Sequence, residues 1–468
     1  MKIVIQNVHI YTVDGEETVF TFSNFLTFIY GNVGTGKSTI INLIMYAFGC
    51  NLTYTPAINN CLKAVQLRVL LNGKPFLFFR MANSNRIQIN DIMRNQRFSL
   101  LHNQISSFLY KQFALPDLYL SMGNIEDKKV KLSFTNFCWF SYLKQSEMDN
   151  NFFYMNSDNI YKQNAAVNVL SSFFESEFLI NQDANQKYRK LKRRLRQFED
   201  CHEVFKYLEK IFYNDDILSE PNPILTVAQL KYQITNALSD KFQYYTNNDL
   251  HRLLNLQKRV DQLEYRISFE LRQERYQKEL DCLRNEMENV VTNIRLNQSE
   301  KNPNVQRLYN LFLDCLINIG FHGVTKFDSV RMDSKTYMPI LSNSYEKQEV
   351  SFENLGSGGK KTMFKICFAL AVHRLQHAKL ELNYLPSFLI IDTPMKNISE
   401  REDFVLYDRF YQYLLNLFST ELSDTQLFVI DKEKRDLKDY KFNENVVLMK
   451  MTHDDWMNPP LFKNYKGL

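Results

Sequence analysis

The chain has 468 residues and a net charge of +5, with 45% apolar and 23% charged residues. This length is enough for about three domains of typical size and for a full apolar core, so disulfide-stabilised miniproteins are excluded. The mixed composition, with only 13 Gly and 11 Pro, also excludes fibrous and disordered chains. The small positive charge permits nucleic-acid binding without requiring it.

The seven cysteines lie far apart, are odd in number and include no C-x-x-C pair. Neither a disulfide framework nor a zinc clip is therefore expected, and a reducing compartment fits best. The chain starts without the basic and apolar segments of a signal peptide, and it contains no run of 18 apolar residues that would cross a bilayer. We expect a cytoplasmic protein with no membrane partner.

Apolar alternation and helical periodicity predict the elements of the first part of the chain. The predicted strands are 2–11, 18–23, 26–30, 64–71 and 75–81, and the predicted helices are 38–48 and 99–113. The third strand leads directly into a glycine-rich loop, and the helix that follows this loop ends at Gly49.

Two later segments carry apolar residues at the alternating spacing of three and four that is typical of a coiled coil. They cover 184–212 and 253–294, with two prolines between them. The two halves of the second segment are offset by one residue, which predicts a local register adjustment near 271–276. We expect an antiparallel helical hairpin over 183–300, with a small helical tip near 213–250.

Residues 31–38, Gly-Asn-Val-Gly-Thr-Gly-Lys-Ser, match the phosphate-loop pattern G-x-x-x-x-G-K-[ST] between a predicted strand and a predicted helix. Backbone N–H groups of such a loop hold the phosphates of a nucleotide, the lysine reaches the terminal phosphates and the serine hydroxyl binds Mg²⁺. A nucleotide with Mg²⁺ is therefore expected here, although the loop alone does not say which kind of nucleotide machine this is. The candidate nucleotide-binding residues are Gly31, Asn32, Gly34, Thr35, Gly36, Lys37, Ser38 and Thr39.

Two further motifs lie far downstream. Residues 354–361, Asn-Leu-Gly-Ser-Gly-Gly-Lys-Lys, precede a helix predicted over 363–375. Residues 386–392 form an apolar strand that ends in Asp392, which is the form of a Walker B element. A flexible turn before a helix is the alternative for the Leu-Gly-Ser-Gly-Gly sequence, but the Walker B strand that follows it disfavours this interpretation.

In this order, with a helical hairpin between them, the motifs resemble the ABC-type ATPases of the structural-maintenance-of-chromosomes (SMC) and recombination-repair superfamily. The resemblance covers about 1–180 and 303–468. It implies an α/β fold, in which an ABC-type P-loop ATPase head is assembled from an N-terminal segment (1–182) and a C-terminal segment (301–468). The antiparallel coiled-coil hairpin (183–300) is inserted between them.

The resemblance also implies ATP and Mg²⁺ as cofactors and a head-to-head homodimer that encloses two nucleotides. Ser357, Gly358 and Gly359 would then face the γ-phosphate held by the P-loop of the other subunit. A short hydroxyl and bare glycine N–H groups at a helix N-terminus suit that task.

Catalytic roles follow from the same resemblance. Asp392 would hold the Mg²⁺ shell together with Ser38, and Gln145 stands at the position of the Q-loop, a contact to Mg²⁺ and water. A surface glutamine is the alternative for Gln145. The family places a glutamate directly after the Walker B aspartate, whereas this chain has Thr393, which can orient water but cannot accept its proton.

Turnover is therefore expected to be slow unless another acid enters the site. Asp431 and Glu433, at the end of a strand predicted over 425–431, are the candidates for that acid. An acidic loop that caps the strand is an equally weighted alternative.

A basic run stands at the root of the first predicted coil arm: Arg189, Lys190, Lys192, Arg193, Arg194 and Arg196. In the related machines duplex DNA lies across the engaged heads and the coil roots, so these side chains would neutralise phosphates without reading bases. A solvated helix face is the alternative.

Two functions remain open from the sequence. In the first, ATP-dependent closure of the heads senses or clamps DNA and acts through a partner effector such as a nuclease, in DNA repair or anti-phage defence. The Asp-Thr-Pro sequence at 392–394 resembles that of the divergent bacterial branch of these ATPases, which occurs in anti-phage defence operons. In the second, ATP closure is a slow switch that holds and releases a protein effector, a nuclease or a toxin, without direct action on DNA.

Overall fold

The computed structural model describes most of the chain, in two units: Met1–Phe178 with Glu300–Leu468, here called the head, and Leu179–Ser299, here called the hairpin. The described residues are 1–121, 129–174, 187–188, 190–201, 203–204, 207, 221–239, 246–297, 303–333, 338–343, 349–378, 383–395, 404–433, 445–453, 455 and 457–463.

The head is built around a parallel sheet whose strand order is β10-β14-β15-β3-β16. Its strands are β10 (Tyr142–Leu143), β14 (Phe388–Asp392), β15 (Gln426–Asp431), β3 (Leu26–Gly31) and β16 (Val446–Met451). Every residue of β14 and β15 is buried, as is typical of parallel strands covered on both faces. Strand β3 lies between two strands from the far end of the chain, so neither segment forms this sheet alone.

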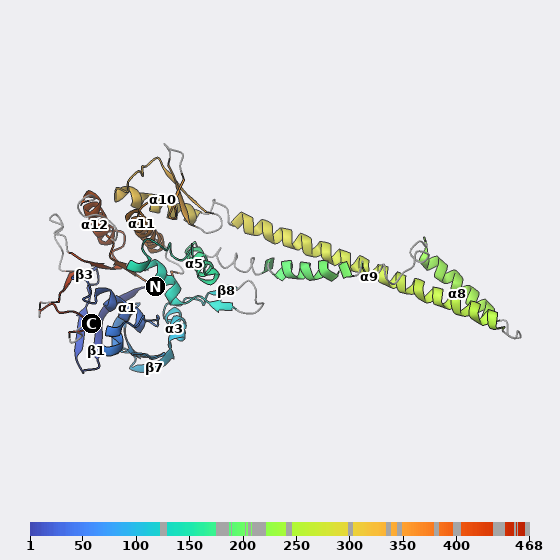
Figure 1. The fold of residues 1–468 in the computed structure, drawn as a ribbon, viewed down its shortest axis with the longest axis horizontal. Helices are drawn as coiled ribbons and strands as arrows, with labels where there is room; N and C mark the ends of the chain where they lie inside the picture. Colours follow the sequence, from blue (N-terminus) through green and yellow to red (C-terminus); the bar gives the residue numbers. More distant parts are fainter. Residues whose placement is uncertain are drawn as a thin grey trace. The chain divides into compact units, whose positions relative to one another are not determined.

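A second, antiparallel sheet has the order β2-β1-β4-β5-β6-β7. Its strands are β1 (Ile3–Thr12), β2 (Glu17–Thr21), β4 (Leu62–Leu71), β5 (Lys74–Met81), β6 (Arg86–Asp91) and β7 (Gln96–Leu101). Helix α1 (Lys37–Ala47) contacts β4 and β5, and Figure 1 shows α1 with this sheet on one side of β3 and α10 to α12 on the other.

The helix predicted over 99–113 is wrong at its start. Residues Ser99 to Leu101 end β7 and pair with β6, and helix α3 covers only Ile105–Gln112. The apolar pair Leu100 and Leu101 fits either periodicity over so short a stretch, and the β6–β7 pairing, absent from the sequence prediction, decides between them.

The remaining elements of the head are short strands and helices around this framework. They are α2 (Pro56–Cys61), β8 (Tyr119–Ser121), β9 (Lys129–Lys131), α4 (Phe134–Phe137), α5 (Ile160–Ser172), α10 (Pro303–Asn318), β11 (Ser329–Met332), β12 (Pro339–Ser342), β13 (Glu349–Ser351), α11 (Gly358–His377) and α12 (Phe404–Ser419), with 3-10 turns at His102–Gln104, Cys138–Phe140 and Gln145–Glu147.

The hairpin contains α8 (Pro223–Ser239), α9 (Asn247–Asn297) and helical residues between 187 and 207. Leu191 and Leu195 pack with Leu280, Leu283 and Val290 of α9. Two ion pairs join these helices, Lys187–Glu286 and Arg194–Glu279, each with 2.7 Å between nitrogen and oxygen. The residue numbers rise on one helix while those of the partners fall on the other, so the two helices are antiparallel.

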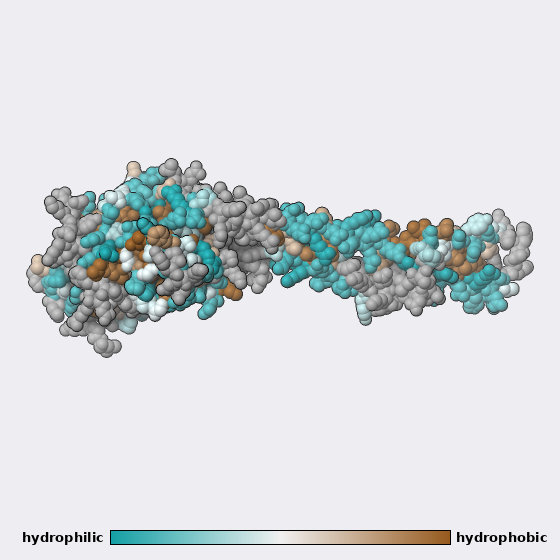
Figure 2. Space-filling view, turned by 90° about the horizontal axis from the view of Figure 1, so that it is seen from above, coloured by the Kyte–Doolittle hydropathy of each residue, from teal (hydrophilic) through white to brown (hydrophobic). Residues whose placement is uncertain are grey.

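Farther along, α8 packs against α9 through a separate apolar cluster, formed by Val227, Leu230, Val260, Leu263 and Phe269. The change from one cluster to the other falls in the region where the sequence predicts a register adjustment, and α9 is continuous through it. Figure 2 shows apolar side chains at the surface in the α8 part of the hairpin, where Ile224, Leu225 and Tyr232 are exposed. Within the described residues, no helix is both long and apolar enough to span a membrane.

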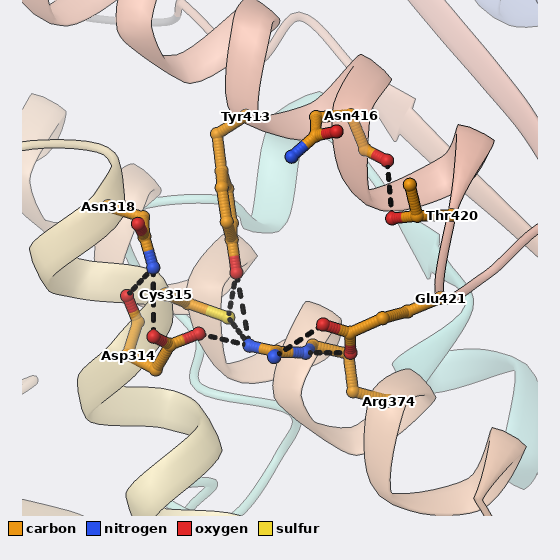
Figure 3. A network of polar contacts seen from close by, with 8 residues as sticks. All are labelled: Asp314, Cys315, Asn318, Arg374, Tyr413, Asn416, Thr420 and Glu421. Atoms are coloured by element: carbon orange, nitrogen blue, oxygen red, sulfur yellow. Dashed lines mark hydrogen bonds and ion pairs between the residues drawn. The ribbon is translucent and has the colours of Figure 1, made fainter.

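One arginine holds together three helices of the head (Figure 3). The Arg374 guanidinium, on α11, donates to Glu421 at 2.7 and 2.9 Å, to Asp314 of α10, and to the Tyr413 hydroxyl of α12 at 3.1 Å. The Arg374 side chain is 10% exposed, whereas its two carboxylate partners are about half exposed, at 48% and 53%. The neighbouring Cys315 thiol has its pKa raised to about 11, mainly by burial.

We predict that Arg374→Met lowers the thermal midpoint of the protein by a few degrees, which corresponds to about 1–2 kcal/mol. Removing one partner of a fully buried ion pair costs more, but both carboxylates here remain accessible to water when the arginine is absent. Arg331→Met is the matched control, because Arg331 and Glu349 form a bidentate pair that is exposed on both sides. Equal midpoints for the two variants, measured by calorimetry, would contradict a structural role for Arg374.

Candidate functional site

The loop between β3 and α1 has the conformation that phosphate loops need. Gly31, Gly34 and Gly36 have φ angles of 128°, 83° and 95°, a region that side chains disfavour. A Cβ atom at Gly31 would lie 1.9 Å from the Met451 carbonyl oxygen, so only glycine lets β3 pass β16 there. Helix α1 begins directly after Gly36, which places the positive end of its dipole at the loop.

Lys37 and Ser38, the first residues of α1, point their polar atoms along this loop. The Lys37 ammonium donates to the carbonyl oxygens of Gly31 at 2.7 Å and Asn32 at 2.6 Å. Partial burial lowers the pKa of Lys37, and the nearby carboxylates of Asp392 and Asp431 oppose that shift. Terminal phosphates would supply the negative charge that this half-buried ammonium lacks.

Asp392, at the end of β14, brings a carboxylate to the same place. Its side chain is buried and accepts hydrogen bonds from the Ser38 hydroxyl at 3.1 Å and the Thr393 hydroxyl at 3.2 Å, and from the backbone of Gln145. Burial raises the pKa of Asp392 despite these bonds. A hydroxyl beside a buried carboxylate is a donor set that suits Mg²⁺, which binds few protein ligands and completes its shell with water and phosphate.

Lys37 and Ser38 line a cavity of about 340 Å³, within the size range of small-ligand sites, and the buried Asp392 carboxylate lies behind the cavity wall, hydrogen-bonded to Ser38. The phosphate loop from Val33 to Thr39 forms one wall, and Gln145, Thr393 and Asp431 also line the cavity. Thus the structure brings Gln145 to the phosphate loop, as the Q-loop hypothesis requires. Sequence reasoning missed two other walls, which are Thr55, Ala57 and Ile58 from α2, and His453 with Pro460, Leu461 and Phe462 near the C-terminus.

Thr393, the residue that directly follows Asp392, has an unusual backbone conformation. Its φ is 60°, although β-branched residues strongly disfavour this region. Its N–H donates to the Ile430 carbonyl at 2.8 Å, and its hydroxyl donates to Asp392. The hydroxyl therefore faces the candidate Mg²⁺ ligand.

The two candidate acids after β15 differ in position. Asp431 is buried in the cavity wall and accepts hydrogen bonds from the Tyr411 hydroxyl at 3.0 Å and the Lys432 N–H at 2.8 Å. Glu433 is exposed and is not among the residues that line the cavity. Of the two acids, the structure brings only Asp431 to the phosphate loop.

Ser357, Gly358 and Gly359 stand at the N-terminus of α11. The Ser357 hydroxyl caps this helix by accepting the Lys360 N–H at 3.3 Å, and its side chain is exposed. None of the three residues lines the cavity of their own chain. Ser357 is thus exposed and Gly358 partly exposed, whereas Gly359 is buried.

A buried lysine connects α11 to the loop after Gln145. The Lys365 ammonium is 2% exposed and donates to the carbonyl oxygens of Glu147 and Asn151, each at 2.6 Å. The backbone of Gln145 in turn contacts Asp392. Contacts therefore run without a break from the candidate Mg²⁺ ligand to the helix that starts at Ser357, a link that sequence reasoning missed because lysines are seldom buried.

The basic run of the hairpin is partly neutralised within the hairpin. Arg194 pairs with Glu279 at 2.7 Å, and Arg193 is half-buried. Lys190, Lys192 and Arg196 are exposed, and the Lys192 ammonium lies over the Tyr188 ring. Arg189 lies outside the described residues. The expected DNA surface is therefore narrower than the sequence predicts.

No protein-family model and no curated protein matches the chain. Among solved structures, it is similar to the Smc head domain with an extended coiled coil bound to the C-terminal domain of ScpA from Pyrococcus furiosus, with a TM-score of 0.44, 11% identity, and coverage of 92% of this chain and 90% of that one. The Smc head domain with a coiled coil and joint from Pyrococcus yayanosii gives a TM-score of 0.42 and 12% identity, with 92% of each chain covered.

Both TM-scores are below 0.5, so the fold is defined by the chain's own strand order and loop geometry. The phosphate loop follows the β3 strand of a parallel sheet, and the Walker B strand is two positions away in that sheet. An antiparallel sheet covers α1, and a helical hairpin is inserted between the two segments that build the sheet. The chain is an α/β protein with an ABC-type P-loop head and an inserted antiparallel helical hairpin.

We predict that Asp392→Asn has opposite effects with and without Mg²⁺. Folding raises the pKa of this carboxyl, so the folded protein keeps the proton to a higher pH than the unfolded chain does. The free energy of unfolding therefore falls as the pH rises from the unfolded to the folded pKa value, and this loss of stability remains near pH 7. Removing the charge should therefore stabilise the nucleotide-free protein by about 1 kcal/mol. It should also abolish the difference between the stabilisation of the protein by ADP with Mg²⁺ and its stabilisation by ADP alone. Thermal midpoints in EDTA and in Mg²⁺ measure both effects.

Asp91→Asn is the control, because Asp91 is also a buried aspartate but belongs to the antiparallel sheet, away from the cavity. It should keep the Mg²⁺-dependent stabilisation. An Asp392→Asn protein that retains this stabilisation would remove Asp392 from the metal site.

Proposed function

We propose that the head binds ATP and Mg²⁺ in the cavity beside the phosphate loop and hydrolyses the nucleotide slowly. The observation that supports this proposal best is the convergence of Lys37, Ser38 and Asp392, which come from two segments more than 350 residues apart. The loop backbone and Lys37 would hold the phosphates, and Ser38 and Asp392 would hold Mg²⁺, which neutralises the charge that develops between the β- and γ-phosphates.

Slow turnover follows from Thr393. Its hydroxyl orients water but does not accept a proton at neutral pH, so the step that the family assigns to a glutamate lacks its usual base. Asp431 is the carboxylate best placed to take that proton, since it lines the cavity and accepts from tyrosines that hold it in position.

We further propose that two heads form the complete site together. Ser357 is exposed, Gly358 is partly exposed, and neither lines the cavity of its own chain. The N-terminus of a helix binds phosphate readily, so a second subunit can present its nucleotide there. In this arrangement ATP joins the subunits, and hydrolysis releases them.

We predict that two inactive variants restore each other's activity when mixed. Lys37→Met removes phosphate binding, and Ser357→Arg blocks the surface offered to the other subunit, so each homodimer should lose ATPase activity. In the mixed dimer, the P-loop of the Ser357→Arg chain faces an intact Ser357, and one competent site results. Phosphate release from the mixture should reach about a quarter of the wild-type rate, because half of the dimers are mixed and each has one of two sites.

Two arms complete this experiment. A mixture in which one chain carries both substitutions and the other is Lys37→Met should stay inactive, because no competent site can form. Adding Asp431→Asn to the Ser357→Arg chain tests the proposed base, which predicts lost turnover with unchanged ADP affinity. Activity of Ser357→Arg alone equal to wild type would show that the site does not need a second subunit.

For the partner of this ATPase, we propose duplex DNA on the basic face of the hairpin, with a nuclease or other effector in DNA repair or anti-phage defence as the output. The exposed cations Lys190, Lys192 and Arg196 support this proposal. The alternative is a slow switch that holds and releases a protein effector without touching DNA. The presence of threonine instead of glutamate at position 393 favours this alternative. DNA-stimulated ATPase activity separates the two.

We predict that Lys190→Gln, Lys192→Gln and Arg196→Gln together weaken DNA binding and flatten its dependence on salt. Each phosphate contact contributes about 0.9 to the slope of log affinity against log salt concentration, so the slope should fall by up to about 2.7. The matched control changes Arg252, Lys258 and Arg272 to Gln, because these cations are equally exposed on α9. Identical slopes for both triple variants, measured by fluorescence anisotropy, would exclude this face as the DNA site.

A further inference from the structure

The residues that follow β16 return to the phosphate loop. We call the described residues of this segment, 452, 453, 455 and 457–463, the clasp. Immediately before it, the Met451 carbonyl accepts the Asn32 N–H at 3.0 Å. Within it, His453 Nε2 lies 3.0 Å from the Val33 carbonyl oxygen, and the Leu461 N–H donates to the Thr35 carbonyl at 2.9 Å. Asn32, Val33 and Thr35 of the loop thus contact the segment from Met451 to Leu461.

The clasp is organised by its own hydrogen bonds. The Thr452 N–H donates to the Asn458 carbonyl at 2.8 Å, which closes a turn. Inside this turn the Asp455 carboxylate accepts the Met457 N–H at 2.9 Å and the Asn458 amide at 2.6 Å, and these bonds lower the pKa of Asp455. Two prolines follow, with fixed φ angles, and set the direction in which the chain reaches the loop.

Packing supports the same contact. Leu461 is 3% exposed and Phe462 is 9% exposed, although both lie close to the end of the described chain. A Cβ atom at Gly36 would lie 2.6 Å from the Leu461 Cβ, so this leucine packs directly on the residue before Lys37. His453, Pro460, Leu461 and Phe462 also line the nucleotide cavity.

In the phosphate loop, the clasp contacts the carbonyl oxygens of Val33 and Thr35. In a phosphate-binding loop the N–H groups turn toward the anion, so the carbonyls of the same peptide units turn away from it. The clasp supplies N–H donors to the Val33 and Thr35 carbonyls. A peptide unit is planar, so fixing its carbonyl also fixes the direction of the N–H group of the next residue.

We propose that the clasp positions the phosphate loop and that clasp docking and nucleotide binding strengthen each other. His453 and Leu461 are the positioning residues. The inference rests on the proposed nucleotide site. Coupling between two binding events is reciprocal, so a docked clasp raises nucleotide affinity and a bound nucleotide holds the clasp in place. Anything that draws the clasp away then lowers nucleotide affinity without touching the phosphates.

The affinity test compares disruptive and conservative variants at the two positioning residues. His453→Ala removes the donor to Val33, whereas His453→Gln retains an N–H donor. Leu461→Ala removes packing at Gly36, whereas Leu461→Met retains the volume. We expect the alanine variants to raise the dissociation constant of Mg-ADP about three- to tenfold, the effect of one lost hydrogen bond, and the conservative variants to stay within about twofold of wild type. Titration calorimetry measures these constants.

A second measurement separates positioning from simple stability. Hydrogen exchange of the 452–463 peptides should slow when Mg-ADP is added to wild-type protein, because the ligand shifts the clasp toward its docked state. The His453→Ala protein should show a smaller protection with an unchanged thermal midpoint, since His453 is exposed. Met457→Ala is the control for both measurements, because the Met457 side chain is 70% exposed.

The outcomes distinguish this inference from the proposed function. Wild-type protein that binds no better than Lys37→Ala would overturn both. Wild-type binding that Lys37→Ala abolishes, together with wild-type affinity in both alanine variants or unchanged exchange in 452–463, would overturn the clasp alone. Weaker binding in the alanine variants, rescue by the conservative ones and slowed exchange together support it.

Discussion

The pairing of β3 with β15 on one side and β16 on the other is the constraint on which the rest of the head depends. These ladders join residues 26–31 to residues more than 390 positions later in the chain. The phosphate loop leaves β3 and the Walker B aspartate ends β14, so the sheet alone decides that Lys37, Ser38 and Asp392 meet. The glycine at position 31 lets β3 pass close to β16.

Charge burial links this architecture to its chemistry. The sheet holds an ammonium and two carboxylates where water is scarce, which lowers the pKa of Lys37 and raises that of Asp392. A nucleotide with its cation would relieve both penalties at once, because it brings negative charge to the first group and positive charge to the second. The strained Thr393 beside them fits the same pattern, since costly conformations concentrate at functional sites.

Much of this organisation could be predicted from the sequence, because the signals were local. The phosphate loop between a strand and a helix, the apolar strand ending in Asp392 and the coiled-coil spacing each depend on residues close together in the chain. The roles of Lys365, His453 and Leu461 depend instead on partners far away in the sequence, and no local pattern reveals them. The basic run was visible, but the partner that neutralises Arg194 comes from the opposite arm.

The position of β3 between β15 and β16 also has a consequence for biosynthesis. Both neighbours are made more than 390 residues after β3, so this strand stays without its sheet partners during that time. The helical hairpin has much shorter-range contacts and can fold during that delay, which fits the general slowness of distant strand pairing. An apolar strand without its partners is prone to aggregate, so fragments that stop before β15 should be far less soluble than the 468-residue chain.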